Sequence, residues 1–265
     1  MNILTVIAEK TRERIGTRKT ELPLAELKAK AQALPAGRDF PFERALRQEG
    51  ISFICEIKKA SPSKGVIAED FPYLEIAREY EAAGAAAISC LTEPDYFQGS
   101  DRYLEEIASV VSIPVLRKDF TVDEYMIYEA KLMGASAVLL ICAILSDDEL
   151  KAYLRLADTL GLSALVEAHT EEEVLRALRS GARIIGVNNR DLTTFTVDVG
   201  TSIRLRSLVP EDVLFVSESG IKNRSDIRSL IENGTDGVLI GETFMRSADK
   251  KAVLAELRGE ADEQD

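Results

Sequence analysis

Short apolar runs alternate with amphipathic stretches along this chain from residue 51 onward. Each run is six or seven residues long and rich in Val, Ile and Leu, which is typical of a strand buried on both faces. The predicted strands are 51–57, 85–91, 113–118, 136–141, 163–168, 183–188, 212–217 and 236–241. Eight such strands, each followed by a helix, predict parallel strands joined by right-handed crossovers.

The intervening stretches have the pattern of surface helices. Apolar residues recur at i, i+3 and i+4 in 73–84, 123–134, 147–161 and 171–181, and each stretch ends with Gly, as helices often do. Eight strand–helix units predict an α/β fold of the (β/α)8 barrel type, whose usual length is about 250 residues. An open doubly wound sheet is the alternative, although the G-x-G-x-x-G loop that usually follows its first strand is missing from this sequence.

The first 48 residues precede the barrel pattern. Residues 3–15 and 23–34 are amphipathic, and 35–50 is interrupted by Pro and Gly. We predict one barrel domain over residues 1–265, with residues 1–48 as a helical N-terminal extension. Two interpretations of the extension remain open: it covers the N-terminal end of the barrel, or it is a flap that closes over the active end.

Composition and charge narrow the function classes. The net charge of −12 argues against nucleic-acid binding, which usually requires a basic surface. No apolar run approaches the ~18 residues of a membrane span, and the N-terminus lacks the features of a signal peptide. Cys55, Cys90 and Cys142 lie in apolar runs without a C-x-x-C pair, so we interpret them as reduced core residues. These features predict a cytoplasmic protein.

Polar residues gather at the predicted C-terminal ends of the strands, where barrels of this type carry their sites. They are Glu56, Lys58, Arg117, Lys118, Asp119, Glu167, His169, Asn188, Asn189, Arg190, Ser217, Glu218, Ser219, Gly220, Gly241 and Glu242. Glu56 and Lys58 lie on one face of their strand, because they are two residues apart. Burying either charge alone would cost several kcal/mol, so we expect the two side chains to pair at the barrel mouth beside an anionic ligand.

Two glycine-containing segments, "SESGI" (217–221) and "IGE" (240–242), follow the last two strands. In this fold a phosphate commonly binds there on backbone N–H groups. Gly220 and Gly241 permit close approach to the backbone, and Ser61 in "SPSKG" can add a hydroxyl. The alternative is that both glycines serve only tight turns.

With these residues assembled, the chain closely resembles the indole-3-glycerol phosphate synthase family of tryptophan biosynthesis. The matching motifs are "EIKKASPSKG", "YFQGS", "PVLRKDF", "LVEAH", "GVNNRDL", "SESGI" and "IGE", in family order over nearly the whole chain. The resemblance implies a lyase that converts the sugar phosphate 1-(2-carboxyphenylamino)-1-deoxyribulose 5-phosphate to indole-3-glycerol phosphate, carbon dioxide and water. It also implies a reaction without cofactor or metal, and we expect a monomer.

The resemblance also implies roles for individual residues. Lys118 matches the general acid of ring closure, Glu167 an acid or base of the dehydration, and Lys58 the lysine that binds the substrate carboxylate. The implied catalytic set is Lys118, Glu167, Lys58, Glu56, Asn188 and Ser219. The implied substrate-binding set is Ser61, Phe97, Phe120, Arg190, Leu192, Glu218, Gly220 and Gly241.

The residue chemistry agrees with these roles, because an ammonium group stabilises and protonates the oxygen on which ring closure builds negative charge. Three alternatives stay open: a Schiff-base aldolase with Lys118 as nucleophile, a phosphoribosylanthranilate isomerase with a Cys–Asp pair, and a non-catalytic sensor of phosphate ligands. We further expect a positive well in an acidic protein, formed by Lys58, Lys59, Lys64, Arg117, Lys118 and Arg190.

Overall fold

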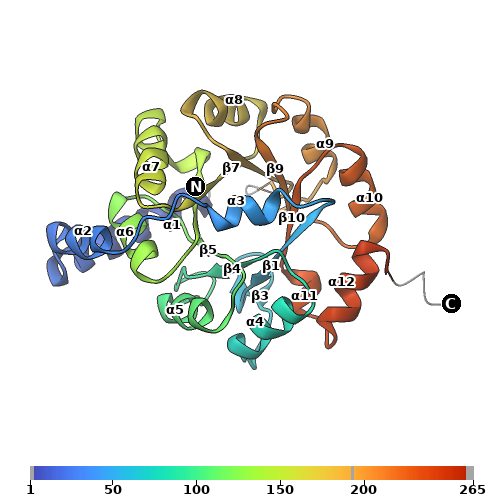
Figure 1. Ribbon diagram of the computed structural model, residues 1–265, viewed down its shortest axis with the longest axis horizontal. Coiled ribbons are helices and arrows are strands. Elements are labelled where there is room, and N and C mark those ends of the chain that lie inside the picture. The colour runs from blue at the N-terminus through green and yellow to red at the C-terminus, as the bar shows by residue number, and fades with distance from the viewer. Residues whose placement is uncertain (1–2, 192–193, 261–265) are drawn as a thin grey trace.

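The computed structural model describes residues 3–191 and 194–260. Eight parallel strands close into a barrel in the order β1-β10-β9-β8-β7-β6-β5-β4 (Figure 1). They are β1 (Ser52–Ile57), β4 (Ala87–Leu91), β5 (Val115–Lys118), β6 (Ala137–Ile141), β7 (Ser163–Ala168), β8 (Ile184–Asn188), β9 (Leu214–Glu218) and β10 (Gly237–Ile240). Every strand agrees with its predicted range to within two residues at each end, so the closed barrel is confirmed and the open sheet is excluded.

Helices surround the strands (Figure 1). They are α4 (Tyr73–Ala82), α5 (Asp101–Val110), α6 (Glu124–Leu132), α7 (Asp147–Thr159), α8 (Glu171–Ser180), α9 (Gly200–Arg206), α10 (Arg224–Glu232) and α12 (Lys250–Arg258). Four short elements lie in the connections: β2 (Ala60–Ser61), β3 (Gly65–Val66), η1 (Cys142–Ile144) and α11 (Glu242–Met245). No helix in the described ranges is both long enough and apolar enough to cross a membrane.

Side chains of each strand alternate between two apolar layers. In β1, Phe53, Cys55 and Ile57 pack against the outer helices, whereas Ile54 faces the barrel interior. Cys90 and Cys142 also lie in the outer layer, and all three cysteines are buried without a disulfide, as expected for core residues.

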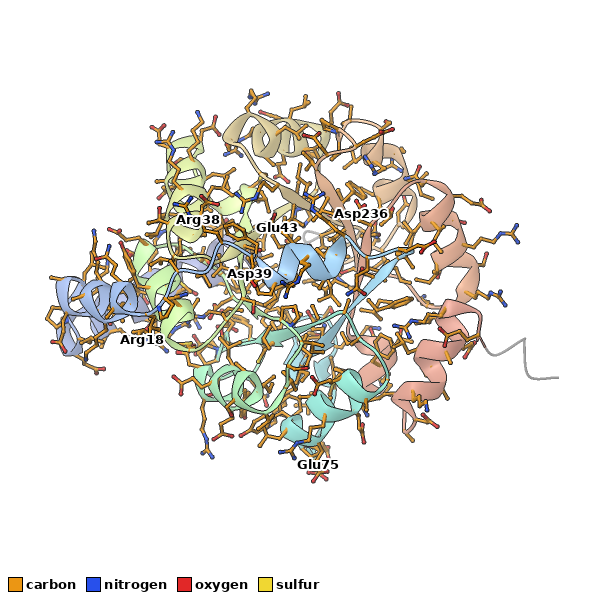
Figure 2. The ribbon with its side chains drawn as sticks, in the orientation of Figure 1. Arg18, Arg38, Asp39, Glu43, Glu75 and Asp236 are labelled. Atoms are coloured by element: carbon orange, nitrogen blue, oxygen red, sulfur yellow. The ribbon has the colours of Figure 1, made fainter. Side chains whose placement is uncertain are left out.

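The N-terminal extension forms α1 (Ile3–Glu21), α2 (Leu24–Ala33) and α3 (Pro41–Leu46). Figure 1 shows α3 lying across the end of the barrel at which the strands begin, and Figure 2 marks its Glu43 there. Glu43 accepts hydrogen bonds from Ser163, the first residue of β7 (3.3 Å), and from Arg183 just before β8 (2.8 Å). This helix therefore covers the N-terminal end, as the first interpretation predicted.

The first helix, α1, contacts the opposite end of the barrel. Leu4 and Ile7 are buried in the interior cluster, and with Ile3 they line the cavity at the carboxyl ends of the strands. The second interpretation, a segment over the active end, is thus correct for the position of α1. The two parts of the extension, α1 and α3, cover opposite ends of one barrel.

Candidate active site

A cavity of about 700 Å³ opens at the carboxyl ends of the strands. Every member of the implied catalytic and substrate-binding sets within the described ranges lines it: Glu56, Lys58, Ser61, Phe97, Lys118, Phe120, Glu167, Asn188, Arg190, Glu218, Ser219, Gly220 and Gly241. Leu192, the remaining one, lies outside the described residues. The strands bring these side chains together because parallel strands present all their carboxyl ends at one mouth.

The cavity has two chemically different sides. Apolar side chains from α1, β6 and the loops after β4 and β5 form one side: Ile3, Leu4, Ile7, Phe97, Phe120, Leu139 and Ile141. The opposite side, around β9, β10 and the loop after β1, also has apolar lining and the acidic Glu242, but it adds hydroxyl, backbone and basic groups: Ser61, Lys64, Gly220, Lys222, Gly241, Thr243 and Arg246. A ligand with an aromatic part and a phosphate fits this division.

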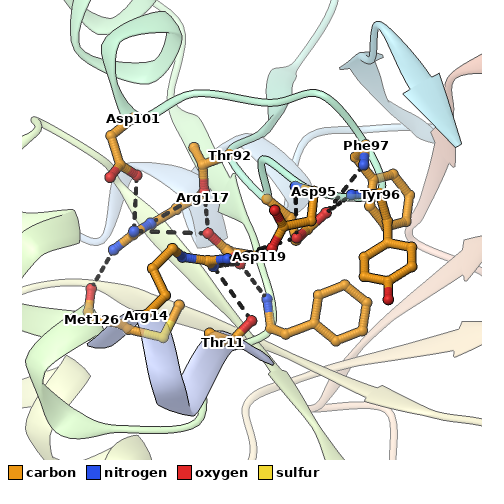
Figure 3. A network of polar contacts seen from close by, with 12 residues as sticks. Thr11, Arg14, Thr92, Asp95, Tyr96, Phe97, Asp101, Arg117, Asp119 and Met126 are labelled. Carbon is orange, nitrogen blue, oxygen red and sulfur yellow. Dashed lines mark hydrogen bonds and ion pairs between the residues drawn. The ribbon is translucent and has the colours of Figure 1, made fainter. Parts of the chain in front are cut away.

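A polar network fixes the apolar side (Figure 3). The buried carboxylate of Glu93 accepts backbone N–H groups of the loop after β4, including that of Phe97 at 3.0 Å. Arg14 of α1 lies 3.7 Å from Glu93 and 3.6 Å from Asp119, which precedes Phe120. The rings of Phe97 and Phe120 lie next to each other, with centroids 6.1 Å apart and planes tilted by 41°. One arginine thus ties the N-terminal helix to both loops that carry these aromatic residues.

Lysine and glutamate side chains lie close together on the floor of the cavity. Lys58 pairs with Glu56, as their spacing predicted. The Nζ atom of Lys118 lies 3.5 Å from Oε2 of Glu167 and 3.8 Å from Oε2 of Glu218. Burial opposes the charge of Lys118, but the surrounding carboxylates outweigh burial and raise its pKa above the ordinary value. Lys118 is therefore held as an ammonium ion.

Two buried glutamates of the site, Glu56 and Glu218, have pKa shifts in opposite directions. Burial raises the pKa of Glu56, but Lys58 and then Lys118 outweigh it and hold the pKa below its ordinary value. For Glu218, burial and the neighbouring Glu167 together raise the pKa well above its ordinary value, and Lys118 only partly offsets them. The site therefore favours the ionised form of Glu56 and the protonated form of Glu218, an arrangement suited to proton transfer.

The prediction of a positive well is wrong for two of its six residues, Arg117 and Lys59. Arg117 faces away from the cavity because it alternates with Lys118 along β5. It is buried under the helices, where its guanidinium donates to the backbone carbonyl of Met126 (2.7 Å) and pairs with Asp101 (2.9 Å). Lys59, which follows Lys58, does not line the cavity either.

Three other strand-end residues also lie outside the cavity lining. The amide of Asn189 donates to Ser217 (3.0 Å), so both residues serve packing behind the site. His169 lies behind Glu167 in the loop between β7 and α8.

Sequence reasoning missed part of the lining. Ile3, Leu4 and Ile7 belong to an amphipathic helix whose destination the sequence left open, and their i, i+4 spacing only predicted burial. Lys222 and Arg246 were missed because they follow the strand ends by several residues. Their proximity to the predicted phosphate segments was the available signal.

The glycines after the last strands have separate structural reasons. Gly220 has φ 84°, and a Cβ there would collide with Val197. A Cβ on Gly241 would collide with the carboxylate of Glu56. Glycine at 241 therefore makes room for a site carboxylate, a reason that the turn and phosphate interpretations did not include.

The fold and this cavity define an α/β-barrel protein with a charged site at the carboxyl ends of its strands. The family model described as "Indole-3-glycerol phosphate synthase" matches residues 4–257. This chain belongs to the indole-3-glycerol phosphate synthase family.

Relatives of this family align with the chain over nearly its full length. The indole-3-glycerol phosphate synthase of Ruminiclostridium cellulolyticum is 58% identical over 98% of this chain and 100% of its own. That of Leuconostoc mesenteroides is 54% identical over 97% and 99%, respectively. Among solved structures, a tryptophan synthase alpha-subunit mutant from Pyrococcus furiosus has a TM-score of 0.57 at 14% identity, covering 78% of this chain and 98% of its own, and supports the fold alone.

Proposed function

We propose that this chain converts 1-(2-carboxyphenylamino)-1-deoxyribulose 5-phosphate to indole-3-glycerol phosphate, with release of carbon dioxide and water. Besides membership of the family, one observation carries the proposal. The Lys118 ammonium lies between the carboxyl groups of Glu167 and Glu218 in a cavity with an apolar side and a basic side. A substrate with an aromatic ring, a ketone and a phosphate requires these groups together.

The division of the cavity supports one orientation of the substrate. The phosphate binds the backbone at Gly220 and Gly241 and the hydroxyl of Ser61, and the aromatic ring lies against Phe97 and Phe120, with Leu192 as a further apolar contact. Lys58 binds the ring carboxylate. Three residues complete the polar wall that surrounds the sugar chain: Asn188, Arg190 and Ser219.

Ring closure comes first in the proposed sequence. The ring carbon that bears the carboxylate attacks the ketone carbon, and Lys118 gives a proton to the ketone oxygen as the carbon–carbon bond forms. The positive charge of the ammonium stabilises the developing oxyanion. The nearby carboxylates raise the pKa of Lys118, so the side chain carries this proton at neutral pH.

Decarboxylation and dehydration follow. The iminium formed on ring closure accepts the electron pair of the carbon–carboxylate bond, so carbon dioxide leaves without a cofactor. The new hydroxyl then leaves as water with a proton from an acid, while a base removes the ring proton. We assign Glu167 to this proton transfer, with Lys58 as second proton donor and Glu56 positioning the lysines.

The alternative functions have less support. A Schiff-base aldolase needs a neutral lysine, whereas the carboxylates around Lys118 favour its charged form. A Cys–Asp isomerase needs a thiol at the mouth, whereas Cys55 packs in the outer layer, away from the cavity.

A turnover assay tests the proposal. The chain contains 7 Tyr and no Trp, so an indole product should fluoresce above a tyrosine background. We expect indole fluorescence to grow with time when the anilino-deoxyribulose phosphate is added to the purified protein. A protein that binds a substrate analogue but yields no indole signal would be a sensor, and borohydride trapping of an adduct on Lys118 would support the aldolase.

We further propose that residues 1–265 form one domain and act as a cytoplasmic monomer without nucleic-acid or membrane partners. The net charge of −12 supports the absence of nucleic acid, because a phosphate backbone would be repelled.

A further inference from the structure

His169 is the single histidine of the chain and lies one residue after β7. Its side chain is 16% exposed and does not line the cavity. The proposed reaction therefore does not use it directly, although it lies two residues from Glu167. A mostly buried imidazole beside a candidate catalytic carboxylate needs a physical reason.

The imidazole of His169 lies between two carboxylates from different elements. Its Nε2 atom is 3.6 Å from Oε1 of Glu167 on β7, and its Nδ1 atom is 3.5 Å from Oε2 of Glu173 on α8. Nε2 is also buried without a hydrogen-bond partner among the described residues. This nitrogen therefore has the carboxylate of Glu167 as its nearby ionic partner.

Glu173 is itself fixed at the start of α8. Its carboxylate accepts the backbone N–H of His169 at 2.6 Å, and its own N–H donates to the side chain of Thr170 at 3.2 Å. The helix start thus anchors the imidazole from behind.

Glu167 joins this pair to the cavity. While Oε1 faces His169, Oε2 lies 3.5 Å from Nζ of Lys118. The two oxygens of one carboxylate are consequently oriented by two cationic or potentially cationic groups on opposite sides. A rotation of the carboxylate would weaken both contacts.

We propose that His169, anchored by Glu173, is a positioning residue that fixes the orientation of the Glu167 carboxylate and stabilises its charged form. The inference rests on the proposed function, in which Glu167 transfers a proton during dehydration. His169 acts through Glu167 and does not touch the substrate.

The surrounding charges favour an imidazolium ion. Burial lowers the pKa of His169, but the hydrogen bond that the imidazole donates to Glu173 and the charges of Glu167 and Glu173 outweigh it and raise the pKa above the ordinary 6.5. Glu218 of β9 acts in the same direction more weakly.

Two further groups, Arg176 and Cys142, interact with Glu173 and so lie near the His169–Glu167 pair. Burial raises the pKa of Glu173, but contacts with His169 outweigh burial and hold this pKa below its ordinary value. Arg176, one turn along α8, adds a smaller effect in the same direction as His169. The Cys142 thiol, which donates to the backbone carbonyl of Glu173 at 3.6 Å, stays neutral because burial raises its pKa to about 12. Neither supplies a competing positive partner for Glu167.

A simpler role for Glu173 is to cap α8, because it holds a backbone N–H whatever the side chain at 169. That role predicts no electrostatic coupling between the imidazole and Glu167. The coupling can therefore be measured separately from the cap.

The first experiment follows the imidazole by NMR over a pH titration of the untagged full chain, in which the single histidine gives the only imidazole signals. Glu167→Gln and Glu173→Gln should each lower the pKa of His169 by at least about half a unit, because each removes a negative neighbour. Glu172→Gln is the matched control, since Glu172 is exposed on the same helix. An imidazole titration unaffected by Glu167→Gln would overturn the inference. This measurement needs no substrate, so its result is independent of the proposed function.

The second experiment measures turnover of the substrate against pH. His169→Gln should lower kcat about 10–100-fold through misplacement of Glu167, with KM changed less than about twofold. Its kcat–pH profile should also differ from that of wild type, because the variant lacks the imidazole that titrates beside Glu167. Thermal unfolding checks that the variant is folded, and His169→Asn replaces it if it is not.

The outcomes separate the two ideas. If wild type and Glu172→Gln turn the substrate over and His169→Gln has the same kcat–pH profile, the inference fails while the proposed function stands. If wild type gives no product, the proposed function fails, and the imidazole titration alone decides whether His169 and Glu167 are coupled.

Discussion

An ion pair crosses the inside of the barrel between Lys118 on β5 and Glu167 on β7, with 3.5 Å between Nζ and Oε2. The two strands are separated by β6, so the two side chains meet across one strand on the inner face of the barrel. Water is largely excluded here, since Lys118 and Glu167 have side chains 15% and 3% exposed. Charges in such a site act strongly on a bound ligand because little solvent screens them.

Replacing Lys118 tests the proposed general acid. Lys118→Ala should lower kcat about 10²–10⁴-fold, the usual contribution of a positioned acid, and should leave the fold intact. Lys251→Ala is the control, because Lys251 is exposed on α12, away from the cavity. Steady-state kinetics and circular dichroism check both variants. Retention of activity within threefold would mean that Lys118 is not the acid.

The strands and the site were predictable from sequence for the same reason. Eight apolar runs fix eight parallel strands, and parallel strands place their carboxyl ends at one mouth, so residues far apart in sequence such as Glu56, Lys118 and Glu218 had to converge. Alternation along β5 also determines that Arg117 faces outward once Lys118 faces inward. By that rule Arg117 could not belong to the positive well.

Contacts of the N-terminal extension could not be predicted. The amphipathic pattern of α1 requires an apolar partner but does not say which end of the barrel supplies it. Arg14 selects the active end through Glu93 and Asp119, side chains from two loops separated by a helix. The same limit applies to His169, whose two carboxylate neighbours belong to different elements.

Salt dependence tests the electrostatic contribution to substrate capture. Within the described residues the cavity is lined by six Lys or Arg and five Asp or Glu, whereas the whole chain has 33 and 45. A doubly anionic substrate is therefore attracted locally and repelled elsewhere, so kcat/KM should fall several-fold as ionic strength rises from about 0.05 to 0.5 M.

Lys222 offers a variant for the same measurement. Lys222→Gln should flatten the salt dependence of kcat/KM, because it removes one exposed charge from the cavity rim. Lys251→Gln, which removes a charge outside the cavity, should leave the slope unchanged. A wild-type kcat/KM independent of salt would rule out electrostatic attraction of the substrate.

Glu218 should make stability depend on pH. Its pKa in the folded chain lies above the ordinary 4.5, first because of burial and then because of Glu167. From about pH 4.5 upward the unfolded chain loses this proton while the folded chain keeps it, so this residue lowers the free energy of unfolding as pH rises. The loss continues until pH passes the raised pKa, with a limiting slope of about 1.4 kcal/mol per pH unit.

Denaturant unfolding of Glu218→Gln at several pH values checks this linkage. The glutamine has no proton to lose, so the stability of the variant relative to wild type should increase from pH 5 to pH 8, an interval of about 3 units. Glu211→Gln, at an exposed position, controls for the loss of one carboxyl group. A relative stability that decreases over this range would show that Glu218 is ionised in the folded chain.

Gly220 tests the proposed phosphate position. Gly220→Ala adds a Cβ that meets Val197 at a backbone φ of 84°, so either the side chain or the loop must move. Gly181 is a matched control, because its φ is 88° and nothing lies within 4 Å of an added Cβ. Both alanine variants should lose about 1–2 kcal/mol of stability to the left-handed conformation.

The two variants should differ in substrate binding. Movement of the loop at Gly220 displaces backbone donors from the phosphate, and loss of a hydrogen bond to a charged group corresponds to a KM increase of about 10–100-fold. The chemical groups around Lys118 stay in place, so kcat should fall less than KM rises. Gly181→Ala should leave KM unchanged, because Gly181 ends α8 and does not line the cavity. If Gly220→Ala lowers kcat alone, the phosphate does not bind at this loop.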